Sequence, residues 1–353
     1  MTGRTFKPLL GVVALGAAMT LAACSSGTTA APTSSGGSSG APSNIVIGIS
    51  NTVEGNGWRE TMICSIKAQA LASGDVSKVI SISKNGDPSS QIQDMQNLIS
   101  QGVNMIIVDP SDPQKLNQVI QEATSRGITV IAVDSSVTEP TAYVVSNDQT
   151  KYGALGMQWL ADKLGGKGNI LYMRGTQGVS ADTDRDNGVQ SVLQNYPGIT
   201  VKTVWTNWDY TTAAQIATQE FTASNYDGVW TTGPDSSVVT AIQATGKPLV
   251  PVIGADNNGF IQDLISGDPG ALVTNPAAVG GAAVTVGLNV MSGDKPDRTT
   301  LLTPQIFDAT NNLSDLQSLY DPNLGALDNP TVSVPGYTTY TKDQLRACKG
   351  PGE

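Results

Sequence analysis

The sequence predicts an α/β protein with two lobes, each built around a doubly wound parallel sheet. From residue 44 onward, short apolar runs rich in β-branched residues alternate with longer amphipathic stretches. The apolar runs are continuous rather than interrupted by polar residues, which is typical of strands buried on both faces of a parallel sheet. The pattern starts again after about residue 148, and a chain of 353 residues is long enough for two domains of this kind.

In the first half, strands are expected at 45–50, 79–82, 105–109 and 129–134, and helices at 57–73, 89–101 and 113–126. The apolar residues between Ile92 and Ile99 recur with helical spacing. Glycine is common just after the last turn of a helix, so Gly102 and Gly127 mark the ends of the second and third helices.

In the second half, strands are expected at 169–173, 199–206, 228–232 and 249–255, and helices near 150–164, 183–195, 211–223 and 235–245. A helix near 258–267, a strand at 271–274, a helix at 277–291 and a strand at 304–307 follow. The remaining residues are rich in proline and predict turns.

The first 24 residues have the pattern of an export signal. Two positive charges precede an apolar run, Leu9 to Ala18, that is too short to span a membrane. The sequence Leu-Ala-Ala-Cys that ends at Cys24 resembles a bacterial lipobox, so we expect residues 1–23 to be removed and Cys24 to carry a lipid. The alternative is an ordinary secretory peptide with a chance cysteine. Residues 25–43 contain only Ser, Gly, Thr, Ala and Pro, which predicts that residues 24–43 form a flexible tether.

The cysteine content agrees with an exported protein. With Cys24 lipidated, Cys64 and Cys348 remain, and an even number of cysteines in an exported chain usually pairs. We therefore predict a disulfide between Cys64 and Cys348 that ties an early helix to the C-terminus. The alternative is two buried free thiols.

Charge and composition exclude several kinds of function. The net charge is −10 and the pI is about 4.5, so phosphate backbones repel the chain and no nucleic-acid partner is expected. The sequence has no histidine, which excludes Ser-His-Asp and Cys-His catalysis and histidine-liganded metal centres. It also lacks a P-loop, and no GxGxxG follows the first strand, so we expect no cofactor and no metal.

Short polar side chains end several of the expected strands, where ligands bind in open α/β sheets. A carboxylate accepts hydrogen bonds from two neighbouring hydroxyls and an amide both donates and accepts, so these residues suit a ligand with clustered hydroxyls. Any single one could instead cap the next helix, and Asp109 and Asp148 are better explained as caps or turn formers. The strand-end residues are Ser50, Asp109, Asp134, Asn147, Asp256 and Asn275.

Aromatic and basic residues lie in loops that follow two of the strands. A turn around Asn56 precedes Trp58 and Arg59, and Trp208 follows a strand of the second half. An indole ring stacks on the C–H face of a sugar, and a guanidinium donates several hydrogen bonds to its hydroxyls. Packing between a helix and a sheet is the alternative role for Trp58.

These features together resemble the type I periplasmic sugar-binding proteins, the ribose/galactose-type solute receptors of ABC importers. The resemblance covers nearly all of residues 44–310 in family order. Besides the lipobox, the segments that carry it are Ile-Val-Ile-Gly-Ile-Ser and Gly-Asn-Gly-Trp-Arg within 45–59, Val-Ile-Ala-Val-Asp at 130–134, Ser-Asn-Asp at 146–148, Ala-Asp-Thr-Asp-Arg-Asp-Asn-Gly at 181–188, Val-Ile-Gly-Ala-Asp at 252–256 and Leu-Val-Thr-Asn-Pro at 272–276.

The resemblance implies two lobes joined by a three-segment hinge, with crossovers near residues 147, 275 and 303, that close over one small polyol. The implied N-terminal lobe comprises 44–147 and 276–302, and the C-terminal lobe comprises 148–275 and 303–320. Residues 321–353 are expected to return to the N-terminal lobe as a C-terminal extension.

The resemblance also implies which residues bind the ligand. Asp184 and Arg185 would enter from the second lobe, although a charge cluster at a helix start is more commonly a solvated cap. Ser135 stands where ribose receptors place an arginine. The implied ligand-binding residues are Asn56, Trp58, Arg59 and Asp134 in the first lobe, Asp184, Arg185, Trp208 and Asp235 in the second, and Asp256 and Asn275 near the hinge.

The resemblance therefore implies a monomeric binding protein, not an enzyme, that captures a monosaccharide or sugar alcohol and delivers it to an ABC-type permease. A lipid on Cys24 would anchor it to the outer face of the bacterial cytoplasmic membrane, with no other membrane contact. One alternative is a sensory receptor for a sugar or autoinducer on the same fold. Another is an anchored carbohydrate-active enzyme that uses paired carboxylates such as Asp134 and Asp256.

Overall fold

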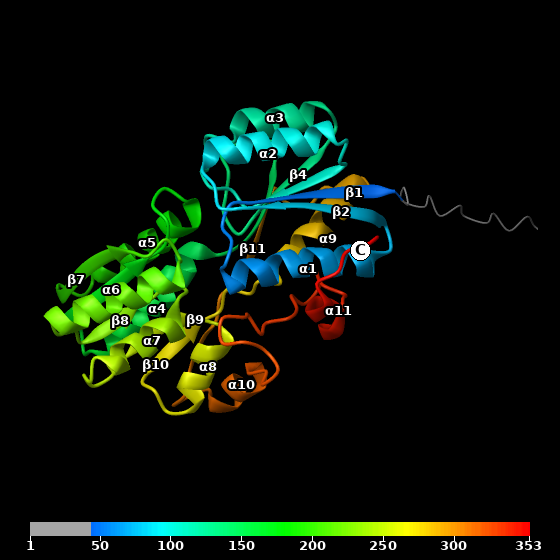
Figure 1. Ribbon diagram of the computed structural model, residues 1–353. Helices are drawn as coiled ribbons and strands as arrows, with labels where there is room; N and C mark the ends of the chain where they lie inside the picture. The colour runs from blue at the N-terminus through cyan, green and yellow to red at the C-terminus, as the bar shows by residue number, and fades with distance from the viewer. Residues whose placement is uncertain (1–43) are drawn as a thin grey trace, which may run out of the picture. The chain divides into compact units, whose positions relative to one another are not determined.

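The computed structural model describes residues 44–353, so the predicted signal peptide, Cys24 and the tether lie outside the described residues. The described strands form two six-stranded sheets, and helices cover both faces of each sheet (Figure 1). The prediction of two doubly wound α/β lobes is therefore confirmed. None of the helices within residues 44–353 is long and apolar enough to cross a membrane.

The first lobe consists of β1 (Ile45–Asn51), α1 (Gly57–Ser73), β2 (Val76–Ser83), α2 (Pro88–Ser100), β3 (Met105–Val108), α3 (Asn117–Ser125), β4 (Thr129–Val133), β5 (Tyr143–Asn147), α9 (Val279–Met291) and β11 (Thr299–Leu302). Its sheet is entirely parallel, with the order β11-β5-β4-β3-β1-β2. Alternate residues of a strand face opposite layers of helices. Ile47 and Ile49 pack with α1 and α9, whereas Gly48 leaves room for Leu98 of α2 on the other face.

The second lobe consists of α4 (Gln149–Lys163), β6 (Lys167–Arg174), α5 (Ser180–Leu193), β7 (Gly198–Trp205), α6 (Tyr210–Ala223), β8 (Gly228–Trp230), α7 (Asp235–Ala244), β9 (Val252–Ala255), α8 (Asn258–Ile265), β10 (Gly270–Val273) and β12 (Ile306–Asp308). The strand order is β12-β10-β9-β8-β6-β7, and only the edge strand β12 is antiparallel to its neighbour. Trp230 is fully buried between the sheet and α4, where it contacts Tyr152 edge-on with the ring centroids 6.0 Å apart. The helices α6, α7 and α8 pack on the opposite face.

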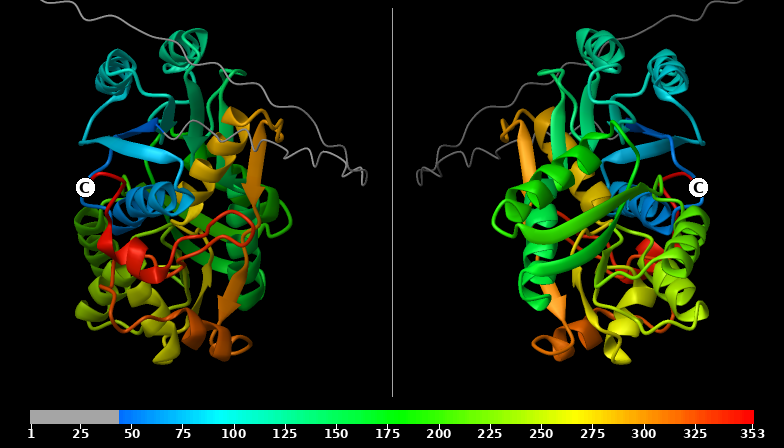
Figure 2. Two further views of the ribbon diagram at one scale, coloured as in Figure 1. Left: turned by 90° about the vertical axis from the view of Figure 1, so that its right-hand side faces the viewer. Right: turned by 90° about the vertical axis from the view of Figure 1, so that its left-hand side faces the viewer.

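The chain passes between the sheets three times, from β5 to α4, from β10 to α9 and from β11 to β12. Figure 2 shows the last passage, which joins the two orange strands of the upper and lower lobes. Hydrogen bonds connect these crossovers to one another. The Asn147 amide donates to the Thr274 carbonyl oxygen (2.9 Å), and the Thr274 N–H donates to the Gln305 carbonyl oxygen (2.8 Å). The Asp148 N–H donates to the Leu302 carbonyl oxygen (2.8 Å), so the three crossovers lie side by side.

Most expected elements are present, with boundaries that differ by a few residues. The helix expected at 57–73 has these bounds, whereas the helix expected at 113–126 begins only at Asn117, after a turn. Three elements were not predicted: β11, α10 (Leu313–Leu319) and α11 (Lys342–Ala347). For β5, only its last residue, Asn147, was expected at the end of a strand. Residues of β11 alternate between exposed and half-buried, so this edge strand lacks the continuous apolar run that marks the central strands.

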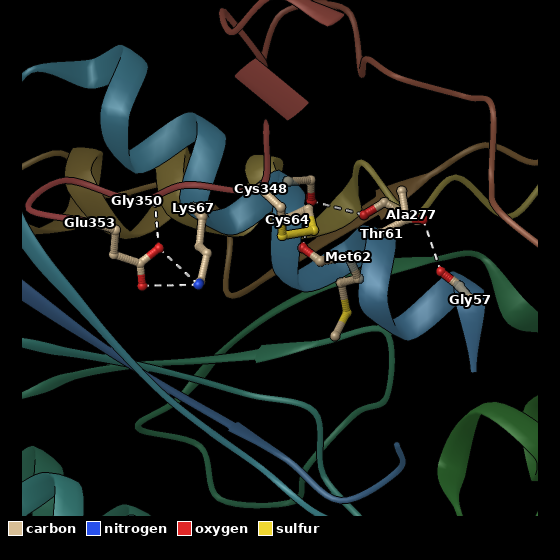
Figure 3. The surroundings of a disulfide bond; sticks show 10 residues. Gly57, Thr61, Met62, Cys64, Lys67, Ala277, Cys348, Gly350 and Glu353 are labelled. Atoms are coloured by element: carbon tan, nitrogen blue, oxygen red, sulfur yellow. Dashed lines mark hydrogen bonds and ion pairs between the residues drawn. A yellow bond between two sulfur atoms is a disulfide. The ribbon is translucent and has the colours of Figure 1, made fainter. Parts of the chain in front are cut away.

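The C-terminal residues return from the second lobe to the first. After α10 the chain runs to α11, which lies beside α1 (Figure 1). Cys348 follows α11 and forms a disulfide with Cys64 of α1, with the two Cα atoms 4.5 Å apart (Figure 3). Beyond it, the Glu353 carboxylate pairs with the Lys67 ammonium group (2.9 Å). The predicted disulfide is confirmed.

We expect reduction of this disulfide to lower the free energy of unfolding by about 2–5 kcal/mol, because the bond removes conformational freedom from the unfolded chain. Urea denaturation of residues 44–353 with and without reductant measures the difference. The double variant Cys64→Ser/Cys348→Ser is the control, and its transition should not respond to reductant. A wild-type midpoint that reductant leaves unchanged would contradict the expectation.

Candidate functional site

A cavity lies where the carboxyl ends of strands from both sheets meet the crossovers. The empty space among its lining residues is about 520 Å³, which includes space that is open to solvent. Seven of the ten predicted ligand-binding residues line it. The lining residues are Asn56, Trp58, Arg59, Asp134, Arg185, Trp208, Tyr210, Thr232, Gly233, Ala255, Asn257, Asn275 and Asn329.

The start of α1, from its N-cap Asn56 onward, positions two of the predicted residues. Asn56 caps the helix, since its Oδ1 accepts a hydrogen bond from the Arg59 backbone N–H (3.1 Å). Its Nδ2 donates to the carbonyl oxygen of Trp208 in the second lobe (3.1 Å). The Trp58 indole N–H donates to the carbonyl oxygen of Asn275 in the second crossover. Through these hydrogen bonds, the start of α1 connects the first lobe to the second lobe and to the second crossover.

Residues of the first lobe hold one nitrogen of the Arg59 guanidinium in place. Its Nη1 pairs with the Asp109 carboxylate and donates to Asn51 Oδ1 (3.0 Å). Burial raises the pKa of Asp109 to about 7, and the positive charge of Arg59 opposes that shift. Nη2 of Arg59 has no hydrogen-bond partner among residues 44–353 and remains free to donate to a ligand.

Gln149, the first residue of α4, connects charged groups from the two lobes. Its Nε2 donates to Asp134 Oδ1 (3.0 Å), and its Oε1 accepts from Arg185 Nε (2.8 Å). Arg185 also donates from Nη1 to the Thr232 carbonyl oxygen (3.0 Å) and lies 4.3 Å above the ring of Tyr152. In the described part of the chain, Asp134 Oδ2 and Arg185 Nη2 have no partner, so both can bind a ligand. The sequence analysis missed Gln149, which looks like an ordinary polar residue at a helix start.

Close packing of α4 against α5 brings Gln149 and Arg185 together. A Cβ at Gly153 would lie 2.0 Å from the Arg185 carbonyl oxygen, and one at Gly188 would lie 2.0 Å from that of Thr150. Both contacts involve backbone atoms that have no room to move. Glycine at these two positions therefore lets the helices approach closely enough for the Gln149–Arg185 hydrogen bond.

Backbone strain is concentrated around the cavity. Among residues 44–353, five non-glycine residues have positive φ, and Asp134 (62°), Trp208 (55°) and Thr232 (57°) line the cavity. Each such conformation costs on the order of 1–3 kcal/mol and persists where the surrounding structure imposes it. The Trp208 ring packs over Gly175, where a Cβ would lie 2.0 Å from the indole. Functional sites are where such strain is commonly found.

At the hinge side of the cavity, Asp256 is fully buried and does not line it. Its Oδ1 accepts from the Asn275 N–H (2.8 Å) and its Oδ2 from the Thr331 hydroxyl (2.8 Å). Its carbonyl oxygen accepts from Asn329 Nδ2 (3.0 Å). Burial raises the pKa of the Asp256 carboxyl, and these donors oppose the shift. Asp256 therefore supports the lining residues Asn275 and Asn329 instead of facing the ligand.

Asp184 and Asp235 were also expected to contact the ligand, and the structure places both outside the lining. Asp235 is fully buried at the start of α7, where it accepts from the N–H groups of Gly233 (3.1 Å) and Ala255 (2.9 Å) and from two side chains. Burial raises its pKa to about 7, against the effect of these donors. Asp184 lies half-buried in the first turns of α5, and burial raises its pKa as well.

Six lining residues were not predicted. Most of them adjoin predicted residues in the loops that follow the strands, and the neighbouring motifs are the only signal that could have found them. Asn329 differs, because it lies in the turn-rich C-terminal residues, where no motif marks it. The unpredicted residues are Tyr210, Thr232, Gly233, Ala255, Asn257 and Asn329.

The lining combines free donors on two guanidinium groups, one free carboxylate oxygen, several amides and two indole rings. This combination suits a small neutral molecule with several hydroxyls. No three acidic, cysteine or histidine side chains among residues 44–353 are grouped so that they could hold a metal ion. A cavity between two α/β lobes joined by three crossovers defines a binding protein that encloses its ligand between the lobes.

Comparison with known proteins identifies the family. Residues 47–295 match the periplasmic binding protein domain, so the chain belongs to this family, as the sequence resemblance predicted. A solved structure of an ABC transporter solute-binding protein from Thermobispora bispora has the same fold, with a TM-score of 0.74 at 22% sequence identity. That match covers 86% of this chain and 94% of the other.

Two curated relatives are similar in sequence. The xylitol-binding protein of Mycolicibacterium smegmatis is 31% identical over 180 residues, which are 49% of this chain and 52% of that protein. The chain thus matches about half the length of this relative. The ribose import binding protein of Bacillus subtilis is 23% identical over 269 residues, which are 74% of this chain and 86% of that protein.

We expect Asp235→Ala to lower the free energy of unfolding by about 3 kcal/mol, because each buried N–H left without an acceptor costs about 1–3 kcal/mol. Urea denaturation of the ligand-free protein measures this change. Asp184→Ala is the matched control, because Asp184 lies near the start of a second-lobe helix and accepts no hydrogen bond among the described residues. The control should change the free energy by less than about 0.5 kcal/mol. Equal stability of Asp235→Ala and wild type would show that the hydrogen bonds of Asp235 do not stabilise the fold.

Proposed function

We propose that this protein is an extracytoplasmic binding protein that captures a monosaccharide or sugar alcohol between its lobes and delivers it to an ABC-type permease. The observation that carries the proposal is the cavity lining, where Arg59, Asp134 and Arg185 keep free polar atoms beside Trp58 and Trp208. Hydrogen bonds from charged groups to hydroxyls are stronger than neutral ones. The indole rings can cover the C–H surface of a sugar or polyol.

The curated relatives support a ligand with five carbon atoms. One is named for xylitol binding and the other for ribose import. Both molecules are uncharged and carry a hydroxyl or ring oxygen on nearly every carbon, which matches a lining rich in single donors and acceptors. We therefore propose pentitols and pentoses as the first ligands to test.

The paired-carboxylate enzyme considered from the sequence has less support. Hydrolysis of a glycoside needs two carboxyl groups that flank the scissile bond. Asp134 lines the cavity, but both carboxylate oxygens of Asp256 are hydrogen-bonded to protein groups and the residue is fully buried. Among residues 44–353, Asp134 is the only acidic residue in the lining. A binding function without catalysis fits this arrangement better.

Closure of the lobes is the proposed means of capture. We assign residues 44–147 and 276–302 to one moving body and 148–275 and 303–320 to the other, with the three crossovers as the hinge. Hydrogen bonds between the lobes join Asn56 to Trp208 and Ser136 to Ser180 (2.7 Å). A ligand that binds both lobes stabilises the closed form. The difference between its affinities for the closed and open forms sets the fraction of the protein that is closed.

We further propose that the protein acts as a monomer attached to the outer face of the membrane by a lipid on Cys24. The Leu-Ala-Ala-Cys sequence and the tether that follows it support this proposal. Sequences of Ser, Gly, Thr, Ala and Pro form flexible chains, and nineteen such residues would span roughly 24 Å, enough to place the lobes just above a membrane-embedded permease.

We expect xylitol or ribose to raise the melting temperature of residues 44–353, since a ligand at 100 times its Kd adds about 2.7 kcal/mol to the free energy of unfolding. Trimethylamine N-oxide at the same concentration controls for osmolyte effects that need no binding site. Asp134→Asn should abolish the shift while the ligand-free protein stays folded, because it removes the free acceptor. The absence of a shift with pentoses, pentitols, hexoses and hexitols would contradict the proposed function.

We expect Gln149→Glu to weaken ligand affinity at least tenfold, or about 1.4 kcal/mol. The substitution places a second carboxylate beside Asp134 in place of an N–H donor, and it pulls Arg185 toward the new charge. Isothermal titration calorimetry measures the Kd. The loss should shrink at lower pH, because two adjacent carboxyl groups can share a proton.

Gln190→Glu is the matched control for this experiment. Gln190 Nε2 donates to Asp186 Oδ1 (3.1 Å) on the exposed surface of α5, so the control adds the same charge beside an aspartate away from the cavity. Its Kd should equal that of wild type. Equal losses in the two variants would show that net charge, not the Gln149 contacts, causes the effect.

A further inference from the structure

We propose that residues 321–353, here named the C-terminal strap, complete the ligand site, and that Asn329 is a positioning residue for its hinge side. The strap lies outside residues 47–295, the part of the chain that matches the family. This inference rests on the proposed function, because it concerns the affinity of the same cavity for a sugar or polyol.

The start of the strap is bound to the second lobe. Nδ2 of Asn258, the first residue of α8, donates to the carbonyl oxygens of Asp321 (2.9 Å) and Leu324 (3.2 Å). The Gly259 N–H donates to the Ala326 carbonyl oxygen (2.8 Å). The first turn of α8 thus uses its free N–H and side-chain groups to hold the strap.

The middle of the strap forms part of the cavity wall. Asn329 lines the cavity and is 2% exposed. Its Nδ2 donates to the Asp256 carbonyl oxygen (3.0 Å), and its Oδ1 accepts from the Ala277 N–H (3.3 Å). Thr331 donates to Asp256 Oδ2 (2.8 Å), while Asp256 Oδ1 accepts from the Asn275 N–H. Asn329 and Thr331 therefore fix Asp256, and through it the lining residue Asn275.

The end of the strap is bound to the first lobe. The disulfide joins Cys348 to Cys64 of α1, and Lys67 of the same helix pairs with Glu353 (Figure 3). Gln69 accepts a hydrogen bond from the Thr339 N–H (2.8 Å). The strap also touches the start of α1, between Asn56 and Trp58, because a Cβ at Gly57 would lie 2.2 Å from the Leu327 carbonyl oxygen.

Within residues 44–353, the strap is therefore a fourth connection between the lobes, and of these four it alone adds a buried amide to the cavity wall from outside the matched domain. Loss of the Asn329 amide would leave the Ala277 N–H and the Asp256 carbonyl oxygen without these partners. Within the strap, only Thr331 would then hold Asp256, the residue that positions Asn275. Binding would then have to order the hinge side of the cavity. This cost lowers affinity, because a preorganised site does not have to bear it.

The test uses the mature protein from residue 24 onward and the sugar or polyol that gives the largest thermal shift. We expect Asn329→Ala to raise the Kd at least tenfold, as measured by isothermal titration calorimetry. Asn323→Ala is the matched control in the same strap, because Asn323 is exposed and bonds only to Asp321 within the described residues. It should leave the Kd unchanged within about twofold.

A second pair of variants, at Thr331, keeps the inference testable if Asn329→Ala does not fold. Thr331→Val keeps the shape of the side chain and removes only the hydroxyl that binds Asp256, so it should raise the Kd about threefold or more. Thr331→Ser keeps the hydroxyl and should restore wild-type affinity. Urea denaturation of each ligand-free variant separates a loss of stability from a loss of affinity.

The outcomes separate this inference from the proposed function. Wild-type protein that binds no sugar or polyol would overturn both. Wild-type binding together with unchanged Kd values for Asn329→Ala and Thr331→Val would overturn the inference alone, and so would lower stability with unchanged affinity. Weakened binding in Asn329→Ala and Thr331→Val, with normal binding in Asn323→Ala and Thr331→Ser, would support it.

Discussion

The buried carboxylate of Asp256 is the interaction on which the arrangement of the hinge depends. Asp256 directly follows β9 of the second lobe, and its two carboxylate oxygens accept hydrogen bonds from the second crossover and from the C-terminal strap. A buried carboxylate is costly unless donors surround it, and here each donor comes from a different segment. Removing either segment would therefore leave one buried carboxylate oxygen without its donor. Asn275 and, through Asn275, Trp58 take their positions from this carboxylate.

The cavity wall carries a second cost, which is backbone strain. Asp134, Trp208 and Thr232 adopt positive φ, and none of them is a glycine. Packing fixes these conformations: the Trp208 ring fills the space over Gly175, and the Thr232 carbonyl oxygen accepts from Arg185. The strained turns place these three residues in the cavity wall. Relaxed turns would direct them elsewhere.

The sequence allowed the lobes and most of the lining to be predicted because parallel strands bring their carboxyl ends to one edge of a sheet. It did not distinguish Asp134 from Asp235, since the family resemblance implied a ligand contact for both. The difference is set by folding: four donors surround Asp235, whereas Asp134 keeps one oxygen free. Gln149 and Asn329 were missed for a related reason, because their roles come from contacts with residues far away in the chain.

The free polar atoms in the cavity offer a physical reason for the lobes to close around a ligand and to stay open without one. When the lobes meet, Arg59, Asp134 and Arg185 lose bulk water on the cavity side, yet each keeps an atom that no group among residues 44–353 satisfies. Leaving such groups buried and unpaired is unfavourable, so the empty closed form is disfavoured. In the proposed function, the hydroxyls of a sugar or polyol would supply the missing partners and contact both lobes at once. The binding energy would then be largest in the closed form, which is the differential affinity that a closing receptor requires.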